Sequence, residues 1–229
     1  LTIVSAANVT ADTSIRAASI SQQAGIGTTT FLGNVDTNTA GVSVNSSGTV
    51  TIGTTVVVSA AGSVNFRSTT SGVILQSTAA ISTTAAGDVT LEAEDQISLA
   101  AGTIITVLSG DLALRSGLAD TDSTGSMLLD GTLQTSTAGR TITLDLNSQQ
   151  GATQASTGAI LSSNLLLLST GSVSASFAFG TSTLNDVNTL AASTSGAVTF
   201  RDLDDLTIGS VSSTSGITTN AGVPNGAPI

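Results

Sequence analysis

The chain has 229 residues and a net charge of −10, and it contains no Cys, His, Lys, Trp or Tyr. These absences exclude ordinary zinc and copper sites, thiol nucleophiles, Ser-His-Asp triads, P-loops and Schiff bases. The acidic balance argues against a nucleic-acid partner, and no apolar run is long enough to span a bilayer.

Small and β-branched residues dominate the chain, a composition that favours strands and turns over helices. In chain order, short strand phrases with alternating apolar residues are predicted at 41–44, 48–52 and 55–58, at 62–67, 72–76 and 80–83, at 87–92, 95–99 and 102–107, at 110–115 and 125–129, at 139–144, and at 196–200, 204–208 and 216–219. Polar insertions are expected at 118–124 and 148–157, where loops leave the corners of the coils.

One strand phrase returns with a period of about 24 residues. The phrases that open at Gly62, Gly87 and Gly110 have glycines 25 and 23 residues apart (87 − 62 and 110 − 87). A repeat on this scale is typical of a solenoid, in which each turn buries its apolar face against its neighbours. We therefore predict an all-β parallel β-helix (β-solenoid) with about three strands and 24 residues per coil.

An antiparallel sandwich is the alternative fold. It would need frequent hairpin turns, and signals such as Asp130-Gly131 and Asn225-Gly226 are few. We expect one solenoid module over 1–219 and a linker or junction over 220–229, where two prolines lie. On the order of nine coils, about 4.8 Å apart, would make a rod of roughly 40 Å.

A charged residue follows most of the repeated strands. These residues are Arg67, Glu92, Arg115 and Asp145, and then Ser169; Arg201 follows a similar phrase in a later coil. If the coils stack in register, Arg67, Glu92 and Arg115 form one column of alternating charge. Each exposed pair contributes little, but a slipped coil would oppose like charges, so the column favours a single register.

Acidic residues cluster at three places that deserve a test as sites. The clusters are Asp202, Asp204 and Asp205; Asp120 and Asp122; and Glu92, Glu94 and Asp95. Carboxylates on loops can bind Ca²⁺, but the calcium-binding nonapeptide and the EF-hand loop are both absent. We expect solvated corner residues, and we predict no catalytic, cofactor-binding or metal-binding residue.

Two other functions use this kind of fold. Carbohydrate-active β-helices pair carboxylates, but they bind sugars on Trp or Tyr platforms and carry basic residues in the cleft, which this chain does not offer. Ice-binding solenoids need Thr-x-Thr in register on successive coils. The Thr-rich stretches 28–30, 54–55 and 141–143 do not align at the coil period in the sequence, so β-propensity is the expected reason for them.

The phrases 187–200 and 203–211 are similar to the degenerate Ser/Thr/Gly/Ala repeats of giant bacterial surface proteins. Over most of 41–220 the chain resembles the repeat region of filamentous-haemagglutinin-like adhesins. The resemblance implies a right-handed β-helix that is exported to the cell surface or shed as a fibre. The amino-terminal secretion domain of that family is not visible, which predicts an interior segment.

The expected function is structural and non-enzymatic: a module that gives length and stiffness to an extracellular or cell-surface filament. An adhesive module that binds host or matrix glycans or a receptor is the alternative, and a carbohydrate-active enzyme is a third. Because solenoid ends leave open strand edges, we expect adjacent repeats or identical subunits to stack head to tail. The first residue, Leu1, and the lack of a signal peptide predict a piece of a longer chain.

Overall fold

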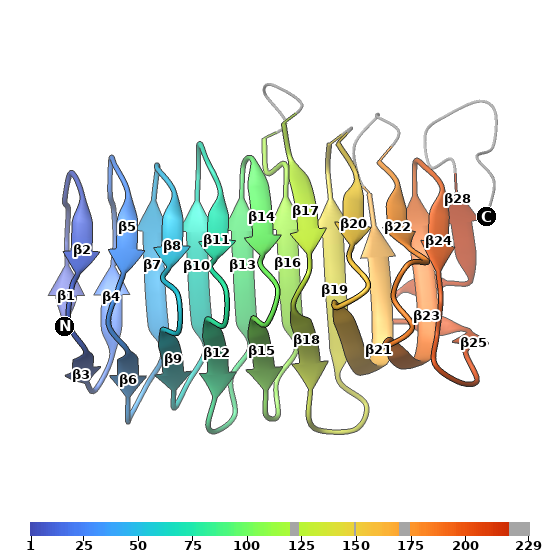
Figure 1. Ribbon diagram of the computed structural model, residues 1–229, viewed down its shortest axis with the longest axis horizontal. Helices are drawn as coiled ribbons and strands as arrows, with labels where there is room; N and C mark the ends of the chain where they lie inside the picture. Colours follow the sequence, from blue (N-terminus) through green and yellow to red (C-terminus); the bar gives the residue numbers. More distant parts are fainter. Residues whose placement is uncertain (120–123, 149, 170–174, 220–229) are drawn as a thin grey trace.

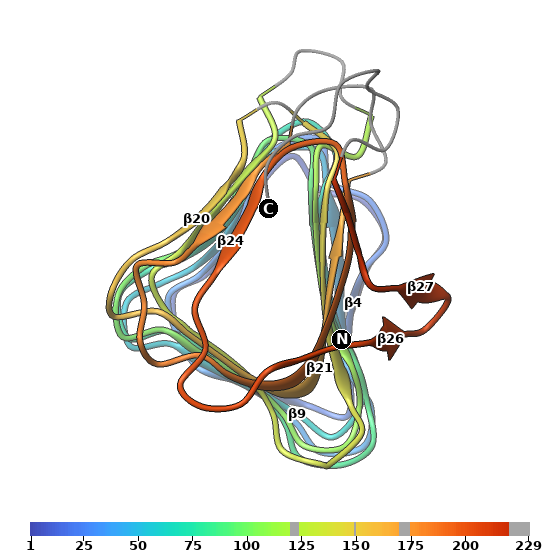
Figure 2. The ribbon, with the colours of Figure 1, turned by 90° about the vertical axis from the view of Figure 1, so that its right-hand side faces the viewer.

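The computed structural model describes residues 1–119, 124–148, 150–169 and 175–219. Within these ranges every regular element is a strand, and the strands stack as nine coils along one axis (Figure 1). Seen along that axis, each coil is a triangle, whose sides we call face 1, face 2 and face 3 in chain order (Figure 2). The predicted all-β parallel solenoid with about three strands per coil is confirmed.

Each face is a ladder with one strand from each coil. Face 1 contains β1 (Thr2–Ile3), β4 (Ile20–Gln22), β7 (Val42–Ser46), β10 (Val64–Ser68), β13 (Val89–Ala93), β16 (Leu112–Ser116), β19 (Thr141–Leu146) and β28 (Ile217–Thr219). Face 2 contains β2 (Val9–Ala11), β5 (Thr29–Phe31), β8 (Val50–Ile52), β11 (Val73–Leu75), β14 (Gln96–Leu99), β17 (Ser126–Leu129), β20 (Ala152–Gln154), β22 (Phe177–Phe179) and β24 (Val198–Phe200). Face 3 contains β3 (Ile15–Ala17), β6 (Val35–Thr37), β9 (Val57–Ala60), β12 (Ala80–Thr83), β15 (Ile104–Val107) and β18 (Thr132–Thr135).

Two long strands close the corner between faces 3 and 1. β21 (Ala159–Leu168) and β23 (Asp186–Thr194) each run from face 3 onto face 1 without a break. They thereby join the two faces into one 17-stranded sheet. The short strand β25 (Thr207–Ile208) pairs with the middle of β23.

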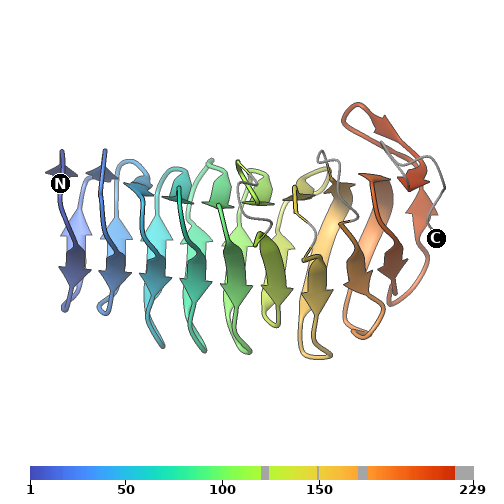
Figure 3. The same cartoon turned by 90° about the horizontal axis from the view of Figure 1, so that it is seen from above.

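The coils stack in parallel register and rise evenly along the axis (Figure 3). Val64 pairs with Val42 on one side and with Val89 on the other. Leu112 pairs with Ile142, and the chain between these two is longer than the chain between Val64 and Val89. The extra residues lie in the connections between strands, so the paired strands keep their register while the loops vary in length.

The solenoid is right-handed. In Figure 1 β4 points up and β5 and β6 point down, and in Figure 2 the chain passes from β4 on the right to face 2 on the left and back below. This anticlockwise path advances toward the viewer, because the carboxyl-terminal coil is nearest. The hand is the one that right-twisted strands favour for parallel connections.

The interior is filled by the alternate residues of every face. On β10 and β13 the inward residues Val64, Phe66, Val89 and Leu91 are buried, and the residues between them face outward. Within the described residues the interior forms one continuous apolar core, and Phe66 contacts Phe31 of face 2 with ring centroids 6.1 Å apart. Burial of this aliphatic interior supplies most of the stabilisation of the rod.

The recurrent glycines stack on one another at the corner before face 1. A Cβ on Gly110 would lie 2.2 Å from the carbonyl oxygen of Gly87, and one on Gly87 would lie 2.6 Å from the carbonyl carbon of Gly62. None of the three has a positive φ. Close approach of consecutive coils, rather than an unusual backbone conformation, therefore requires glycine in the repeated phrase.

Polar side chains connect the coils at the corners, where the strand ladder is interrupted. The Asp88 carboxylate accepts the backbone N–H of Asp111 at 2.8 Å, and the Asp111 carboxylate accepts that of Thr141 at 2.9 Å. At another corner the amide side chains of Gln154 and Asn185 are buried and bond each other at 2.8 Å. These bonds satisfy backbone and amide groups that the corners would otherwise leave unpaired.

The predicted charge column is present for four coils. Arg67, Glu92, Arg115 and Asp145 are consecutive register partners, and Glu92 forms ion pairs with Arg115 at 2.9 Å and with Arg67 at 3.6 Å. The extension to Ser169 is wrong, because Leu168 is the residue that pairs with Asp145.

Arg201 also lies outside the charge column. It follows β24, which belongs to face 2 and pairs with β22. The phrases of faces 1 and 2 have the same alternation, so the sequence does not separate them. Face 3 has a further ion pair, which was not predicted from the sequence. Arg16 and Asp36 are register partners on paired strands, and their side chains lie 3.3 Å apart.

The expected insertions differ in outcome. Residues 148–157 are not a loop throughout, because β20 lies within them and pairs with β17 as a wall of face 2. Of 118–124, only Leu118, Ala119 and Thr124 are among the described residues. The expected linker at 220–229 lies outside them.

One small hairpin leaves the triangular outline. β26 (Ser210–Val211) and β27 (Thr214–Ser215) pair antiparallel and project beside face 1 (Figure 2). Val211 is buried there against Leu166 and Ala191, which form a small apolar cluster on the outside of the solenoid. The outer side of face 1 is therefore partly covered in the last coils.

Candidate functional site

The acidic cluster around Glu92 is engaged in bonds between coils. Glu92 pairs with two arginines, and the Glu94 carboxylate accepts the backbone N–H of Ala119 at 2.7 Å. The Asp95 carboxylate accepts the hydroxyl of Thr124 at 2.6 Å. The three side chains that the sequence grouped together therefore serve different contacts and do not converge on one ligand.

The cluster of Asp202, Asp204 and Asp205 lies in the loop after face 2 of the last coil. The Asp202 carboxylate accepts the backbone N–H of Val187 at 3.1 Å, whereas Asp204 and Asp205 are exposed. Burial raises the pKa of Asp202, and the neighbouring Asp204 and Asp186 carboxylates raise it further, while backbone hydrogen bonds oppose the rise. Among the described residues no group of three or more acids is arranged to hold a metal ion. Asp120 and Asp122 lie outside the described residues.

The expectation that the threonines do not align is wrong for one of the stretches. Thr30 points outward on face 2 and is the register partner of Thr10 and Thr51 in the neighbouring coils. Ile74 takes this position in the next coil, so the row ends there. Thr55 instead forms a tight turn with φ of 63°.

A small cavity of about 100 Å³ lies beside the charge column, lined by Arg115, Gly117, Asp145 and Asn147 among others. The Oδ1 atoms of Asp145 and Asn147 are shielded from solvent and accept no hydrogen bond from the described residues. Burial raises the pKa of Asp145, and attraction to the Arg115 guanidinium offsets part of the rise. The guanidinium beside these oxygens disfavours a bound cation.

A step between two coils lies at the corner of faces 3 and 1. In the earlier coils this corner forms a projecting lobe, seen below β9 and β21 in Figure 2. After β18 the segment 136–140 still loops outward, but the next coil crosses the corner directly along β21. The lobe therefore ends abruptly, and the outer side of β21 lies at the bottom of the step.

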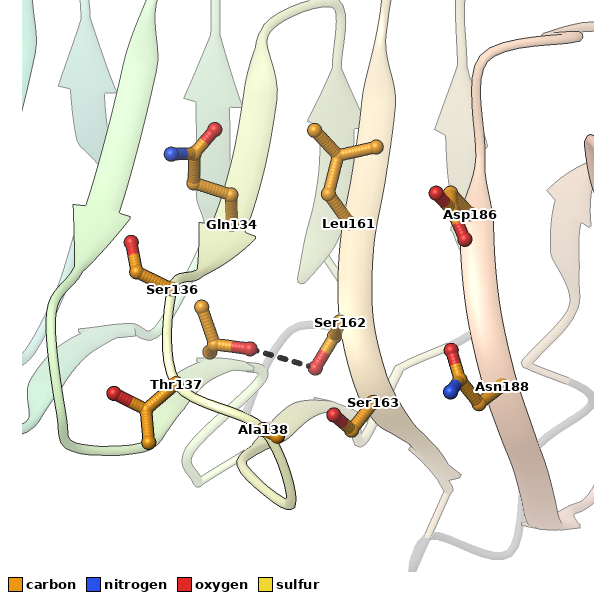
Figure 4. A pocket seen from close by; sticks show the side chains of 10 residues that line it. Gln134, Ser136, Thr137, Ala138, Leu161, Ser162, Ser163, Asp186 and Asn188 are labelled. Atoms are coloured by element: carbon orange, nitrogen blue, oxygen red, sulfur yellow. Dashed lines mark hydrogen bonds between the residues drawn. The ribbon is translucent and has the colours of Figure 1, made fainter.

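An open groove of about 410 Å³ occupies this step (Figure 4). Gln134, Leu161 and Asp186 line it as register partners from three consecutive coils. The residues of the loop wall and of the second row are Ser136, Thr137, Ala138, Ser163 and Asn188. The groove thus presents amide, hydroxyl and carboxylate groups around the aliphatic side chain of Leu161.

Some of these groups are fixed and others are free. The Thr135 and Ser162 hydroxyls lie 2.9 Å apart at the bottom, and Ser163 accepts the backbone N–H of Gly139 at 2.8 Å. Within the described part of the chain, the side chains of Gln134, Asp186 and Asn188 make no hydrogen bond to the protein. The groove therefore combines a preorganised floor with unused polar groups at its edges.

Sequence reasoning did not find the groove. Its residues share no motif, and the groove exists because two consecutive coils differ in the length of one corner. The available signal was the run 159–168, which contains no glycine at the corner where the preceding coils have Gly62, Gly87, Gly110 and Gly139.

The chain matches no family model, and no curated protein or solved structure is significantly similar to it. In the part of the chain that the structure describes, no helix has the length and apolarity needed to cross a bilayer. The fold and the surface of the chain itself are thus the basis for inferring function.

Proposed function

We propose that the chain is a structural, non-enzymatic module of an extracellular or cell-surface filament, to which it gives length and stiffness. The observation that carries this proposal is the parallel ladder, which continues in register from the first coil to the ninth in the described residues. Each coil contributes about 4.8 Å of length and buries its apolar side chains against both neighbours.

The use of polar residues supports this proposal. Most of the acidic side chains among the described residues accept hydrogen bonds from backbone N–H or hydroxyl groups of an adjacent coil or pair with arginines. Examples are Glu92, Asp88, Asp111 and Asp130. Side chains used in this way stabilise stacking and stiffen the rod.

The proposed partners are adjacent repeats or identical subunits stacked head to tail. At the last described coil an apolar hollow of about 380 Å³ is lined by residues that include Leu190, Phe200, Leu206 and Ile217. These side chains belong to the interior of the rod. A further coil stacked there would bury them and extend the ladder, a contact that propagates instead of closing.

Electron microscopy of cells that produce the protein tests this proposal. An antibody against the 229-residue chain, detected with gold particles, is expected to label filaments or fibrous material at the cell surface. Preimmune serum and cells that lack the gene are the controls. Label confined to the cell interior, or surface label on isolated compact particles, would contradict the proposed role.

A further inference from the structure

We propose that the groove at the step, lined by Gln134, Leu161, Asp186 and Asn188, binds a neutral oligosaccharide. The inference adds a ligand to the structural role and does not rest on it. It starts from the three polar side chains that the protein leaves without partners in the groove, among the described residues. Elsewhere the corner side chains mostly bond to the next coil, as Asp88 and Asp111 do.

The hydrogen-bonding groups suit vicinal hydroxyls. Gln134 and Asn188 each present donors and an acceptor, and the Asp186 carboxylate accepts two O–H groups at once. These groups come from different elements, β18 and β23, and lie across β21 in Figure 4. A ligand with donors and acceptors along both edges can therefore bridge the groove.

The floor supplies the apolar part of a sugar site. Leu161 lies between Gln134 and Asp186 and is partly exposed, so its methyl groups can contact the C–H face of a pyranose ring. The row from Gln134 to Asp186 spans two coil spacings of about 4.8 Å each, which is enough for two linked sugars. The volume of about 410 Å³ falls within the range of small-ligand sites.

Charge argues against anionic ligands in the groove. Among the described residues that line the groove there is no Arg, and Asp186 lies close enough to Asp202 for their carboxylates to repel. An acidic polysaccharide or a phosphate would therefore be disfavoured. The described lining also has no aromatic ring on which a nucleobase could stack.

Isothermal titration and amide NMR of the full chain provide the test. The probes are cellohexaose, maltohexaose and xylohexaose, with hexagalacturonic acid and hexalysine as charged comparisons. We expect at least one neutral probe to bind with Kd on the order of 1 mM, which is typical of a shallow site with few contacts. Binding should shift the side-chain amide resonances of Gln134 and Asn188 and should not weaken in 0.5 M NaCl, because the ligand is uncharged.

Matched variants locate the site. The double variant Gln134→Ala/Asn188→Ala is expected to weaken the binding of that probe at least tenfold. Asn65→Ala is the control, because Asn65 is an exposed amide on the outer side of face 1, away from the groove. Circular dichroism should show that all variants fold. The replaced side chains of Gln134, Asn188 and Asn65 make no hydrogen bond to any other described residue, so their loss removes no contact that holds the coils together.

Three results would overturn the proposal. The first is no resonance shift with any neutral hexasaccharide at 10 mM. The second is equal binding by the double variant and the parent. The third is preferential binding of hexalysine that is lost in Asp186→Asn and in high salt, which would assign the groove to cationic ligands. None of these results would affect the structural role, which depends on the ladder.

Discussion

Single polar residues join consecutive coils by side-chain hydrogen bonds at the corners, whereas backbone hydrogen bonds join them along the faces. Asp88 and Asp111 each accept the N–H of the equivalent residue one coil later, and Asn185 connects Gln154, Ile160 and Arg201 inside the rod. The phrases that open at Gly87 and Gly110 continue with Asp88 and Asp111 in the sequence. The sequence did not show that the carboxylate contacts the next coil, because that partner lies a whole coil further along the chain.

Replacing Asp88 tests this role at one position. Asp88→Ala leaves the backbone N–H of Asp111 without its acceptor and is expected to cost about 1 kcal/mol of unfolding free energy. Asp88→Asn keeps an acceptor oxygen and serves as the control, with a smaller loss. The midpoint of urea unfolding measures both. An alanine variant as stable as the parent would show that water replaces the carboxylate without cost.

Asp145 should make stability depend on pH. Burial raises the pKa of its carboxyl above 3.8, and Arg115 offsets only part of the rise. Between 3.8 and the raised pKa the folded state binds more protons than the unfolded state, so stability falls as pH increases through this window. At neutral pH the folded protein carries the whole cost of the buried charge.

Asp145→Asn removes that charge. We expect the variant to be more stable than the parent by about 1 kcal/mol at pH 7, on the scale of one unsatisfied buried polar group. The difference should shrink as pH falls through this window and be small at pH 3, where most of the parent carboxyl is neutral in both states. Thermal melts at pH 7 and pH 3 measure this, with Asp12→Asn, an exposed position, as the control. A variant less stable at pH 7 would mean that the attraction to Arg115 outweighs burial.

At the scale of strands, alternation predicted the burial of Val64, Phe66, Val89 and Leu91, because a period of two places these residues on one side. It could not assign a phrase to a face. Faces 1 and 2 use the same Gly-x-apolar-x-apolar pattern, so the sequence does not show that 196–200 belongs to face 2. It also missed β20, whose only inward hydrophobic residue is Ala152.

The charge column offers a test of the pairing between strands. Replacing Glu92 and Arg115 by alanine, singly and together, should give a coupling free energy of about 0.5 kcal/mol at low salt. The coupling should fall toward zero in 1 M NaCl, because salt screens exposed charges. Urea unfolding of the four proteins measures it.

The pair Asn45 and Arg67 provides the control for this cycle. These residues are also register partners on adjacent coils, but they carry no opposite charges. The same cycle should give no salt-dependent coupling. Equal coupling in the two pairs would attribute the effect to packing between the strands and not to the ion pair.

At the scale of the whole molecule, the period predicted the number and direction of the coils, because every coil buries its apolar side chains against its two neighbours in the same way. The step and its groove could not be predicted. They arise from the difference between a looped corner at 136–140 and a continuous strand in the next coil, and the missing glycine in 159–168 does not by itself predict a groove. A groove on such a rod forms where consecutive coils differ in the length of a corner.

Deletion of one coil tests whether the rod is modular. Removing 62–86 takes out one complete coil, the stretch that separates Val64 from its register partner Val89, and brings β7 against β13. The shortened chain should fold, with a rod shorter by about 4.8 Å in small-angle scattering. Removing only 62–73 should prevent cooperative folding, because it places face 2 residues in the ladder of face 1. Two equally folded deletions would contradict a fixed register.

The central claim is that these coils stack along the axis of a filament. Cryo-electron microscopy of the native assembly measures this directly, through the power spectrum of the filament images. A reflection at about 4.8 Å along the filament axis is the predicted result, because each coil adds one strand spacing to the length. A filament whose reflection at about 4.8 Å lies perpendicular to its axis, or an assembly of isolated compact particles, would contradict the claim.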